Sequence, residues 1–198
     1  MSRFYKAVSA LLVTIAGATA LAQHNPDHDS GQKLSESERA ERRTQIMQMA
    51  KDTLADMKKD ANASDLFSKA YGTAVFDTTK GGLIVTGAGG TGVAMHKNGS
   101  QPVYMHMGEG GVGLGAGLEK YKLVLLFENK EIYDKFIEGA WSASASAQAA
   151  AGRNGAGQVA KFNNGVAVYQ LTDKGVIAQV DFTGVKFWPS DRLNEGPA

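Results

Sequence analysis

Two glycine clusters in the sequence have the spacing with which dinucleotide-binding proteins approach a pyrophosphate. They are Gly87-Ala-Gly89-Gly-Thr-Gly92 and Gly108-Glu-Gly110-Gly-Val-Gly113, and both match G-x-G-x-x-G. In a true site the cluster opens a helix whose N-terminus binds the phosphates. Here each cluster is followed by residues that favour a strand, so the helix is missing from the pattern. We therefore expect no cofactor and keep a nucleotide-dependent oxidoreductase only as a third alternative.

The sequence shows no grouping of nucleophile, acid and base. It contains no H-E-x-x-H, no G-x-S-x-G and no Walker A motif. If the hairpin between His96 and His106 has a loop of two or four residues, the two side chains lie on opposite faces of a sheet. Such a pair is poorly placed to share a metal or a proton. The sequence predicts that the protein is not an enzyme and has neither catalytic residues nor a metal site.

The charge balance excludes one class of partner. The chain has 21 basic and 20 acidic residues and no cysteine. Proteins that grip nucleic acid by releasing counterions need a basic excess or stripe, so we expect no nucleic acid. The basic residues that remain as candidate contacts for an anionic group are Arg42, Arg43, Lys58, Lys59 and Lys80. For each of them the alternative is an ordinary solvated surface.

A set of glycines is predicted to let a neighbour approach the sheet closely. On the strand around Gly115 the glycines alternate with apolar residues, so one face of that strand carries no side chains. A bare face accepts another backbone, a helix or a ligand. The set consists of Gly87, Gly89, Gly92, Gly113, Gly115 and Gly117.

Two helices are predicted ahead of the glycine-rich region. Ser35 and Glu38 form a capping box at the start of the first helix. Ser64 is the predicted cap of a short second helix that ends at Gly72. The apolar stripe of the first helix recurs every three or four residues and consists of Ile46, Ala50, Leu54, Met57 and Ala61.

Short apolar runs between glycines and turn dipeptides predict antiparallel sheet beyond residue 72. One helix, capped by Asn129 and ended by Gly139, interrupts the strands. The fold class is therefore α+β, with a barrel- or sandwich-like antiparallel sheet, an N-terminal amphipathic helix and one inserted helix. The predicted strands are residues 73–77, 83–88, 92–97, 103–108, 112–127, 142–147, 158–162, 166–171, 176–182 and 185–188.

The N-terminus is typical of an export signal. Arg3 and Lys6 precede an apolar stretch, and Ala20-Leu-Ala22 offers the small residues that a signal peptidase accepts. We expect cleavage after Ala22 and a periplasmic or secreted protein. The predicted organisation is a signal peptide at 1–22, a disordered tail at 23–34, one domain at 35–194 with helices at 35–71 and a β-rich core at 72–194, and a tail at 195–198.

A series of short motifs follows a defined order between residues 62 and 194. It begins with Ala70-Tyr-Gly72-Thr-Ala-Val75-Phe76, followed by Lys80-Gly81-Gly82 and the glycines from Gly87 to Gly92. It continues with the glycines from Gly108 to Gly117, the Ser/Ala run ending at Gly152, Val168-Tyr169, Gly175 and Gly184. The order and spacing of these motifs resemble the SYLF family of lipid-binding domains. The resemblance implies a compact β-rich domain with flanking helices that binds lipid. Eukaryotic members bind phosphoinositides and some bind actin, which the export signal argues against here.

Together these patterns predict a non-enzymatic protein of the bacterial cell envelope whose partner is a lipid or a membrane surface. The alternative is a structural or protein-interaction module of the periplasm in which the glycine faces pack internally and no lipid is held.

Overall fold

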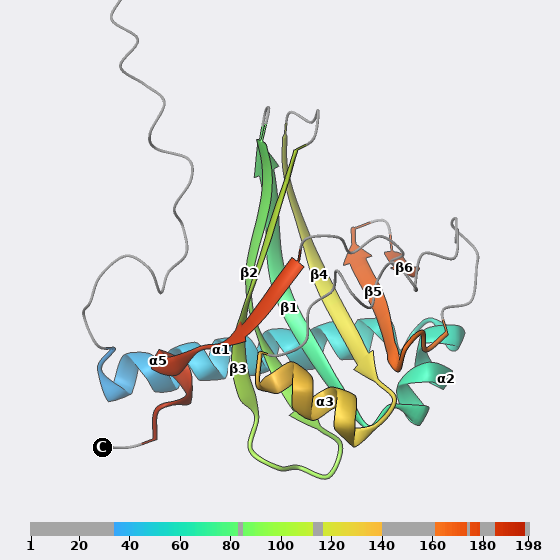
Figure 1. Ribbon diagram of the computed structural model, residues 1–198, viewed down its shortest axis with the longest axis horizontal. Coiled ribbons are helices and arrows are strands. Elements are labelled where there is room, and N and C mark those ends of the chain that lie inside the picture. The colour runs from blue at the N-terminus through green and yellow to red at the C-terminus, as the bar shows by residue number, and fades with distance from the viewer. Residues whose placement is uncertain are drawn as a thin grey trace, which may run out of the picture. The chain divides into compact units, whose positions relative to one another are not determined.

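The seven strands of the described residues form one antiparallel sheet. Figure 1 shows how the helices lie around it. The computed structural model describes residues 34–82, 85–112, 117–139, 161–173, 175–178 and 185–196. The described strands lie in the order β6-β5-β4-β1-β2-β3-β7, which confirms the predicted α+β class with an antiparallel sheet. Their bounds are β1 Gly72–Gly82, β2 Val85–His96, β3 Val103–Val112, β4 Gly117–Phe127, β5 Val166–Thr172, β6 Gly175–Ala178 and β7 Val185–Pro189.

The described helices pack on both faces of this sheet. They are α1 Glu36–Met57, α2 Ala61–Lys69, α3 Lys130–Ile137 and α5 Asp191–Asn194. Residues of α1, α2 and α5 share one apolar cluster with one face, which we call the α1 face, and residues of α3 share a second cluster with the other, the α3 face. In Figure 1, α1 crosses behind the strands and α3 lies in front of them. Helix α3 is the predicted inserted helix, between β4 and β5.

Both faces are apolar because the central strands alternate between two sets of buried side chains. Val75, Val93 and Val124 belong to the cluster on the α1 face. Phe76 and Leu125 belong to the cluster on the α3 face. Since both faces are covered by helices, the strands read as nearly continuous apolar runs rather than as alternating ones.

Helix α1 begins at the predicted capping box. The Glu38 amide donates to Ser35 Oγ at 3.3 Å, and the Ser35 amide donates to Glu38 Oε2 at 2.9 Å. The hydrogen bonds from Ser35 lower the pKa of Glu38 below its usual value. Leu34, which we predicted as part of the tail, is buried in the cluster on the α1 face.

The buried side of α1 follows the predicted stripe except at Ala61, with Ile46 and Leu54 partly buried against the cluster on the α1 face. Its buried residues are Ala50, Thr53 and Met57. Thr53 is tolerated there because its Oγ1 donates to the Met49 carbonyl oxygen at 2.7 Å. Ala61 lies beyond the end of α1 and is exposed, so the stripe stops at Met57.

Helix α2 begins earlier than predicted. Its N-cap is Asp60, whose Oδ1 accepts a hydrogen bond from the Ala63 amide at 2.9 Å. The prediction of Ser64 as the cap was wrong, because Asp60 already satisfies a free amide at the start of the helix. Ser64 instead lies inside α2.

Strand β2 is continuous where we predicted two strands. The sequence predicts a break at Gly89 and Gly90, but these residues pair with Thr79 and Thr78 of β1. A glycine keeps its amide and carbonyl, so it remains in the ladder even though it adds no side chain. In Figure 1, the glycine-rich ends of β1 and β2 run well past the helices.

The remaining strand predictions have mixed outcomes. Strands β5 and β7 agree with the predicted ranges to within one residue, and β6 covers the start of its range. Residues 161 and 162, predicted to end a strand, are not in one. The predicted strand at 142–147, the signal peptide at 1–22 and residues 23–33 of the tail lie outside the described residues.

Candidate functional site: helix α1 and its C-terminal clamp

The candidate lipid-binding residues of α1 form two separate groups. Arg42 and Arg43 lie in its first half, whereas Lys58 is its C-cap and Lys59 follows. An α-helix rises 1.5 Å per residue, so the two groups are about 24 Å apart. The structure therefore does not bring these residues together into one site.

The two lysines are engaged with neighbouring side chains. Lys58 Nζ lies 4.1 Å from the centroid of the Phe67 ring in α2. Lys59 Nζ lies 2.6 Å from Asp56 Oδ1, and both of these side chains are exposed. The carboxylate of Asp56 offsets the charge of Lys59 locally, so this end of α1 offers little net positive charge to an anion.

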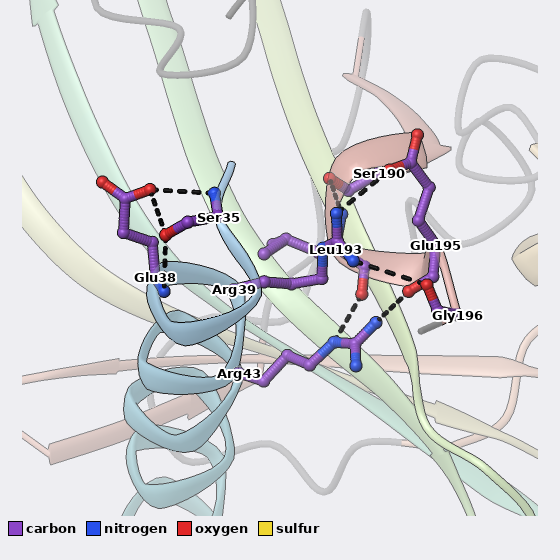
Figure 2. Close-up of polar contacts among 8 residues, drawn as sticks. All are labelled: Ser35, Glu38, Arg39, Arg43, Ser190, Leu193, Glu195 and Gly196. Atoms are coloured by element: carbon purple, nitrogen blue, oxygen red, sulfur yellow. Dashed lines mark hydrogen bonds and ion pairs between the residues drawn. The ribbon is translucent and has the colours of Figure 1, made fainter. Parts of the chain in front are cut away.

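Arg43 is bound to the C-terminal part of the chain (Figure 2). Its Nε donates to the Leu193 carbonyl oxygen and its Nη2 to the Glu195 carbonyl oxygen, both at 2.7 Å. Its guanidinium carbon lies 5.6 Å from the centroid of the Tyr104 ring in β3. The charge of Arg43 is thus directed at the last carbonyls of α5, where a cation is favourable. Arg42, its neighbour, is half-buried.

Arg39, one turn earlier, binds the same segment. Its Nη2 lies 3.1 Å from Glu195 Oε2, and its Nη1 donates to the Gly196 carbonyl oxygen at 3.4 Å. The Arg39 side chain is 11% exposed and that of Glu195 is 47% exposed. We call the contacts of Arg39 and Arg43 with Leu193, Glu195 and Gly196 the C-terminal clamp. We predicted residues 195–198 as a tail, but Glu195 and Gly196 hold α1.

Helix α5, which carries part of the clamp, is fixed to β3 by hydrogen bonds and by a buried leucine. The Tyr104 amide donates to Asn194 Oδ1 at 2.8 Å, and Asn194 Nδ2 donates back to the Tyr104 carbonyl oxygen at 2.8 Å. The Ser190 amide also donates to that carbonyl oxygen, at 2.9 Å. Leu193 is buried in the cluster on the α1 face. The Asn194 amide group therefore continues the ladder of β3 beyond its pairing with β7.

The predicted close-approach glycines behave differently from one another. A Cβ added to Gly92 would lie 2.6 Å from Phe76 Cδ1 and would collide with the Val75 carbonyl oxygen. A Cβ added to Gly89 would meet no atom within 4 Å. Gly92 thus fits the prediction and packs inside the sheet, whereas nothing crowds Gly89.

For three other candidate residues, Lys80, Gly87 and Gly117, the structure gives the strand register. Lys80 of β1 pairs with Ala88 and Glu119, and Gly87 with Gly81 and Gly110. Gly117 pairs with Gly82. Gly113 and Gly115 lie outside the described residues.

The described surface has two exposed large apolar side chains, one on each terminal strand of the sheet. Trp188 of β7 is 37% exposed, and Ile177 of β6 is 42% exposed. Trp188 pairs with His106, whose register partner Thr91 lies on the α1 face with Val93. Ile177 pairs with Gln170, opposite Leu123 of the α3 face. The two side chains therefore lie on opposite faces.

The histidines lie as predicted, on opposite faces. His106 pairs with Thr91 on the α1 face, while the His96 ring contacts Tyr71 at 4.2 Å and Tyr133, of the α3 face, at 6.0 Å between centroids. Within the described ranges no three His, Cys, Asp or Glu side chains gather as metal ligands. None of the described helices has the length and apolar character to cross a membrane.

Sequence reasoning missed Arg39 and all its partners. The clamp joins residues of the first helix to residues near the C-terminus, and no local pattern signals such a contact. Gly108 was also missed as a close-approach position: its Cβ would lie 3.1 Å from Trp188 Cη2. Its place in a G-x-G-x-x-G cluster is the signal that could have identified it, because that cluster does not fit a dinucleotide site and its glycines must serve another purpose.

These features define an α+β domain in which helices cover both faces of one antiparallel sheet. Residues 108–196 match the family described as Las17-binding protein actin regulator, Ysc84. The chain is also 34% identical over 170 residues to beta cell expansion factor A of Aeromonas veronii, a match that covers 85% of this chain and 65% of that relative. Both matches are to the SYLF (Ysc84) family, which confirms the resemblance drawn from the motifs.

Proposed function

We propose that this protein is a non-enzymatic binder of lipid or of a membrane surface in the bacterial cell envelope, exported by cleavage after Ala22. The observation that carries the proposal is the SYLF domain, because its motif resemblance implies lipid binding. The export signal supports an envelope location and argues against actin or nucleic acid as partners.

The contacts that the basic residues already make within the protein favour vesicle binding through apolar contact rather than through charge. Among the candidates, Arg43 is bound to backbone carbonyls and Lys59 to a carboxylate. Trp188 offers the matching apolar group: it is exposed, it lies on the α1 face, and tryptophan is favoured where one end of a ring is apolar and the other wet. Lys186, two residues earlier in β7, is exposed on the same face.

Co-sedimentation with vesicles tests this function. We expect the chain to bind vesicles of phosphatidylglycerol and phosphatidylethanolamine, with little loss of binding at high salt. Trp188→Ala should weaken binding several-fold, because Trp188 is the large exposed apolar side chain that the described residues place on the α1 face. Ile177→Ala is the matched control, since Ile177 is similarly exposed on the opposite face.

One result would count against the lipid function, and another would count against binding through apolar contact. If neither anionic nor phosphatidylcholine vesicles bind the protein, and an organic extract of purified protein contains no lipid, the lipid function is wrong. A steep loss of binding with salt would instead assign it to the basic residues.

A structural or protein-interaction module is the second candidate. The packing of Gly92 against Val75 and Phe76 favours it, because the protein's own neighbouring strand fills the space beside this glycine. Absence of lipid binding, together with recovery of a defined envelope protein after cross-linking, would support this candidate.

A further inference from the structure

The first half of α1 depends on the C-terminal clamp for its position. All buried residues of α1, Ala50, Thr53 and Met57, lie in its second half. The apolar residues before them, Ile46 and Met49 among others, are only partly buried. Besides Leu34, just before the helix, and the partly buried Ile46, it is Arg39 and Arg43 that connect the first half of α1 to the rest of the protein.

The clamp uses the same chemistry that an anionic headgroup would use. Guanidinium groups bind carboxylate and phosphate oxygens through parallel N–H donors. In the clamp these donors are taken by the Glu195 carboxylate and by three carbonyl oxygens, of Leu193, Glu195 and Gly196. A phosphate near α1 would have to compete with these acceptors for Arg39 and Arg43.

The part of the clamp most open to competition is Glu195. Its side chain is 47% exposed, and it follows the end of α5. Helix α5 itself is held to β3 through Asn194 and Ser190. Displacing Glu195 would thus free Arg39 from its carboxylate partner and Arg43 from one of its two carbonyl partners, while α5 stays on the sheet. The bond from Arg43 Nε to the Leu193 carbonyl oxygen would then be the remaining link between Arg43 and α5.

We propose that the C-terminal clamp is an internal competitor that holds the first half of α1 against the sheet, and that an anionic lipid headgroup releases α1 by taking over Arg39 and Arg43. This inference rests on the proposed lipid function and adds its regulation. Release exposes the partly buried residues Ile46, Met47 and Met49 together with the two arginines. Charge and apolar surface then become available at the same step, as membrane-surface helices require.

The test compares Glu195→Lys with Glu131→Lys in the otherwise unchanged chain. Both substitutions change the net charge equally, and each removes the carboxylate of one ion pair. Glu131 is exposed on α3, on the other side of the sheet, where it pairs with Lys135. The net charge of the two variants is therefore matched, and only Glu195→Lys repels Arg39. The exchange measurement without lipid does not depend on which face carries the added lysine. Glu195→Gln should give a smaller effect of the same sign.

Two measurements are made on each variant. Without lipid, amide hydrogen exchange in the first half of α1 should be at least about threefold faster in Glu195→Lys than in the wild type or in Glu131→Lys. Glu195→Lys should also bind vesicles of phosphatidylglycerol and phosphatidylethanolamine at least about threefold more tightly than Glu131→Lys.

The outcomes separate this inference from the proposed function. Unchanged exchange in Glu195→Lys, with normal binding by the wild type, would contradict only the claim that the clamp holds α1. Faster exchange without tighter vesicle binding would contradict the claim that an anionic headgroup competes with the clamp for Arg39 and Arg43. If no variant and no wild-type protein binds vesicles, the lipid function and the competition fail together, whereas the clamp's hold on α1 is judged by exchange alone.

Discussion

Gly92 lies where a side chain would collide with the neighbouring strand. Its missing Cβ leaves room for the Val75 carbonyl group and for the ring of Phe76 in β1. Gly89, in the same strand, is exposed and has no neighbour within 4 Å of the same position. The two residues are identical in type and only three positions apart, so their surroundings alone decide what each contributes.

We predict that Gly92→Ala lowers the free energy of unfolding by about 2–4 kcal/mol, because the backbone of β1 must shift to admit the methyl group. Gly89→Ala should change it by less than about 1 kcal/mol and in the stabilising direction, since alanine loses less conformational entropy on folding. Urea denaturation of both variants measures the difference. Equal midpoints would show that β1 yields to the added group.

The candidate basic residues show the limit of prediction at this scale. The sequence identifies Arg42, Arg43, Lys58 and Lys59 as positive groups on one helix. It does not reveal that Arg43 faces the carbonyl of Leu193 and that Lys58 lies over Phe67, because both partners come from other elements. Residue type is visible in a sequence, but what lies opposite a residue is a property of the fold.

Helix α5 has only four residues, yet it joins three parts of the molecule. It covers the end of β3 through Asn194, it buries Leu193 against the sheet, and it receives Arg43 from α1. An isolated helix of this length would not be stable. Helix α5 must therefore be stabilised by these contacts, so a substitution that breaks them should lower the stability of the whole domain.

Asn194→Ala removes both side-chain hydrogen bonds to the Tyr104 backbone. Since Tyr104 is buried, its amide loses a partner without gaining full access to water, and we predict a loss of about 1–3 kcal/mol in the free energy of unfolding. Asn62→Ala, at an exposed position of α2, should change it by less than about 0.5 kcal/mol. A similar effect of both substitutions on the melting temperature would contradict this role of Asn194.

Elements with local signals were predicted well. The capping box at Ser35 and the cap at Asn129 place the starts of α1 and α3, because the groups that satisfy a helix end lie within three residues of it. The start of α2 was missed because Asp60 and Ser64 are both acceptable caps by type. Strand β2 was divided because glycine disfavours strands on average, although its pairing partners on both sides hold it in place here.

Two tyrosines couple the stability of the whole molecule to alkaline pH. Burial raises the pKa of Tyr133, on the α3 face, to about 12, and it does the same for Tyr169, on the α1 face. The ordinary value is 10.0, so the unfolded chain releases these protons at lower pH than the folded protein. The contribution of these two tyrosines to the free energy of unfolding is therefore complete below pH 10 and is lost as the pH rises from 10 to about 12.

The double variant Tyr133→Phe/Tyr169→Phe tests this coupling. The free energy of unfolding of the wild type should fall over that pH range, and the fall should be smaller in the variant. At neutral pH we expect no loss from Tyr169→Phe, because the Tyr169 hydroxyl is buried without a hydrogen-bond partner among the described residues. Parallel pH curves for the two proteins would show that other groups cause the alkaline loss.

The strand order was beyond the reach of the sequence. The pattern of apolar runs and turns indicates which segments are strands, and Asn98-Gly99 indicates that β2 and β3 are neighbours. It does not indicate that β4 passes β2 and β3 to pair with β1, or that β7 returns to β3. These pairings depend on which faces the helices cover, and that is decided only when the whole chain is assembled.

The same strand order has a consequence for how the chain folds. During synthesis β1 pairs with β2 and β2 with β3, but the second edge of β1 waits for β4. Such long-range pairing is slow, and an open strand edge invites association with other chains. Helix α1, although made before any of the described strands, finds its complete surface only when β5 and α5 have emerged. The first described element to be synthesised is thus among the last to be secured, and a chaperone that shields it would protect the chain over that whole interval.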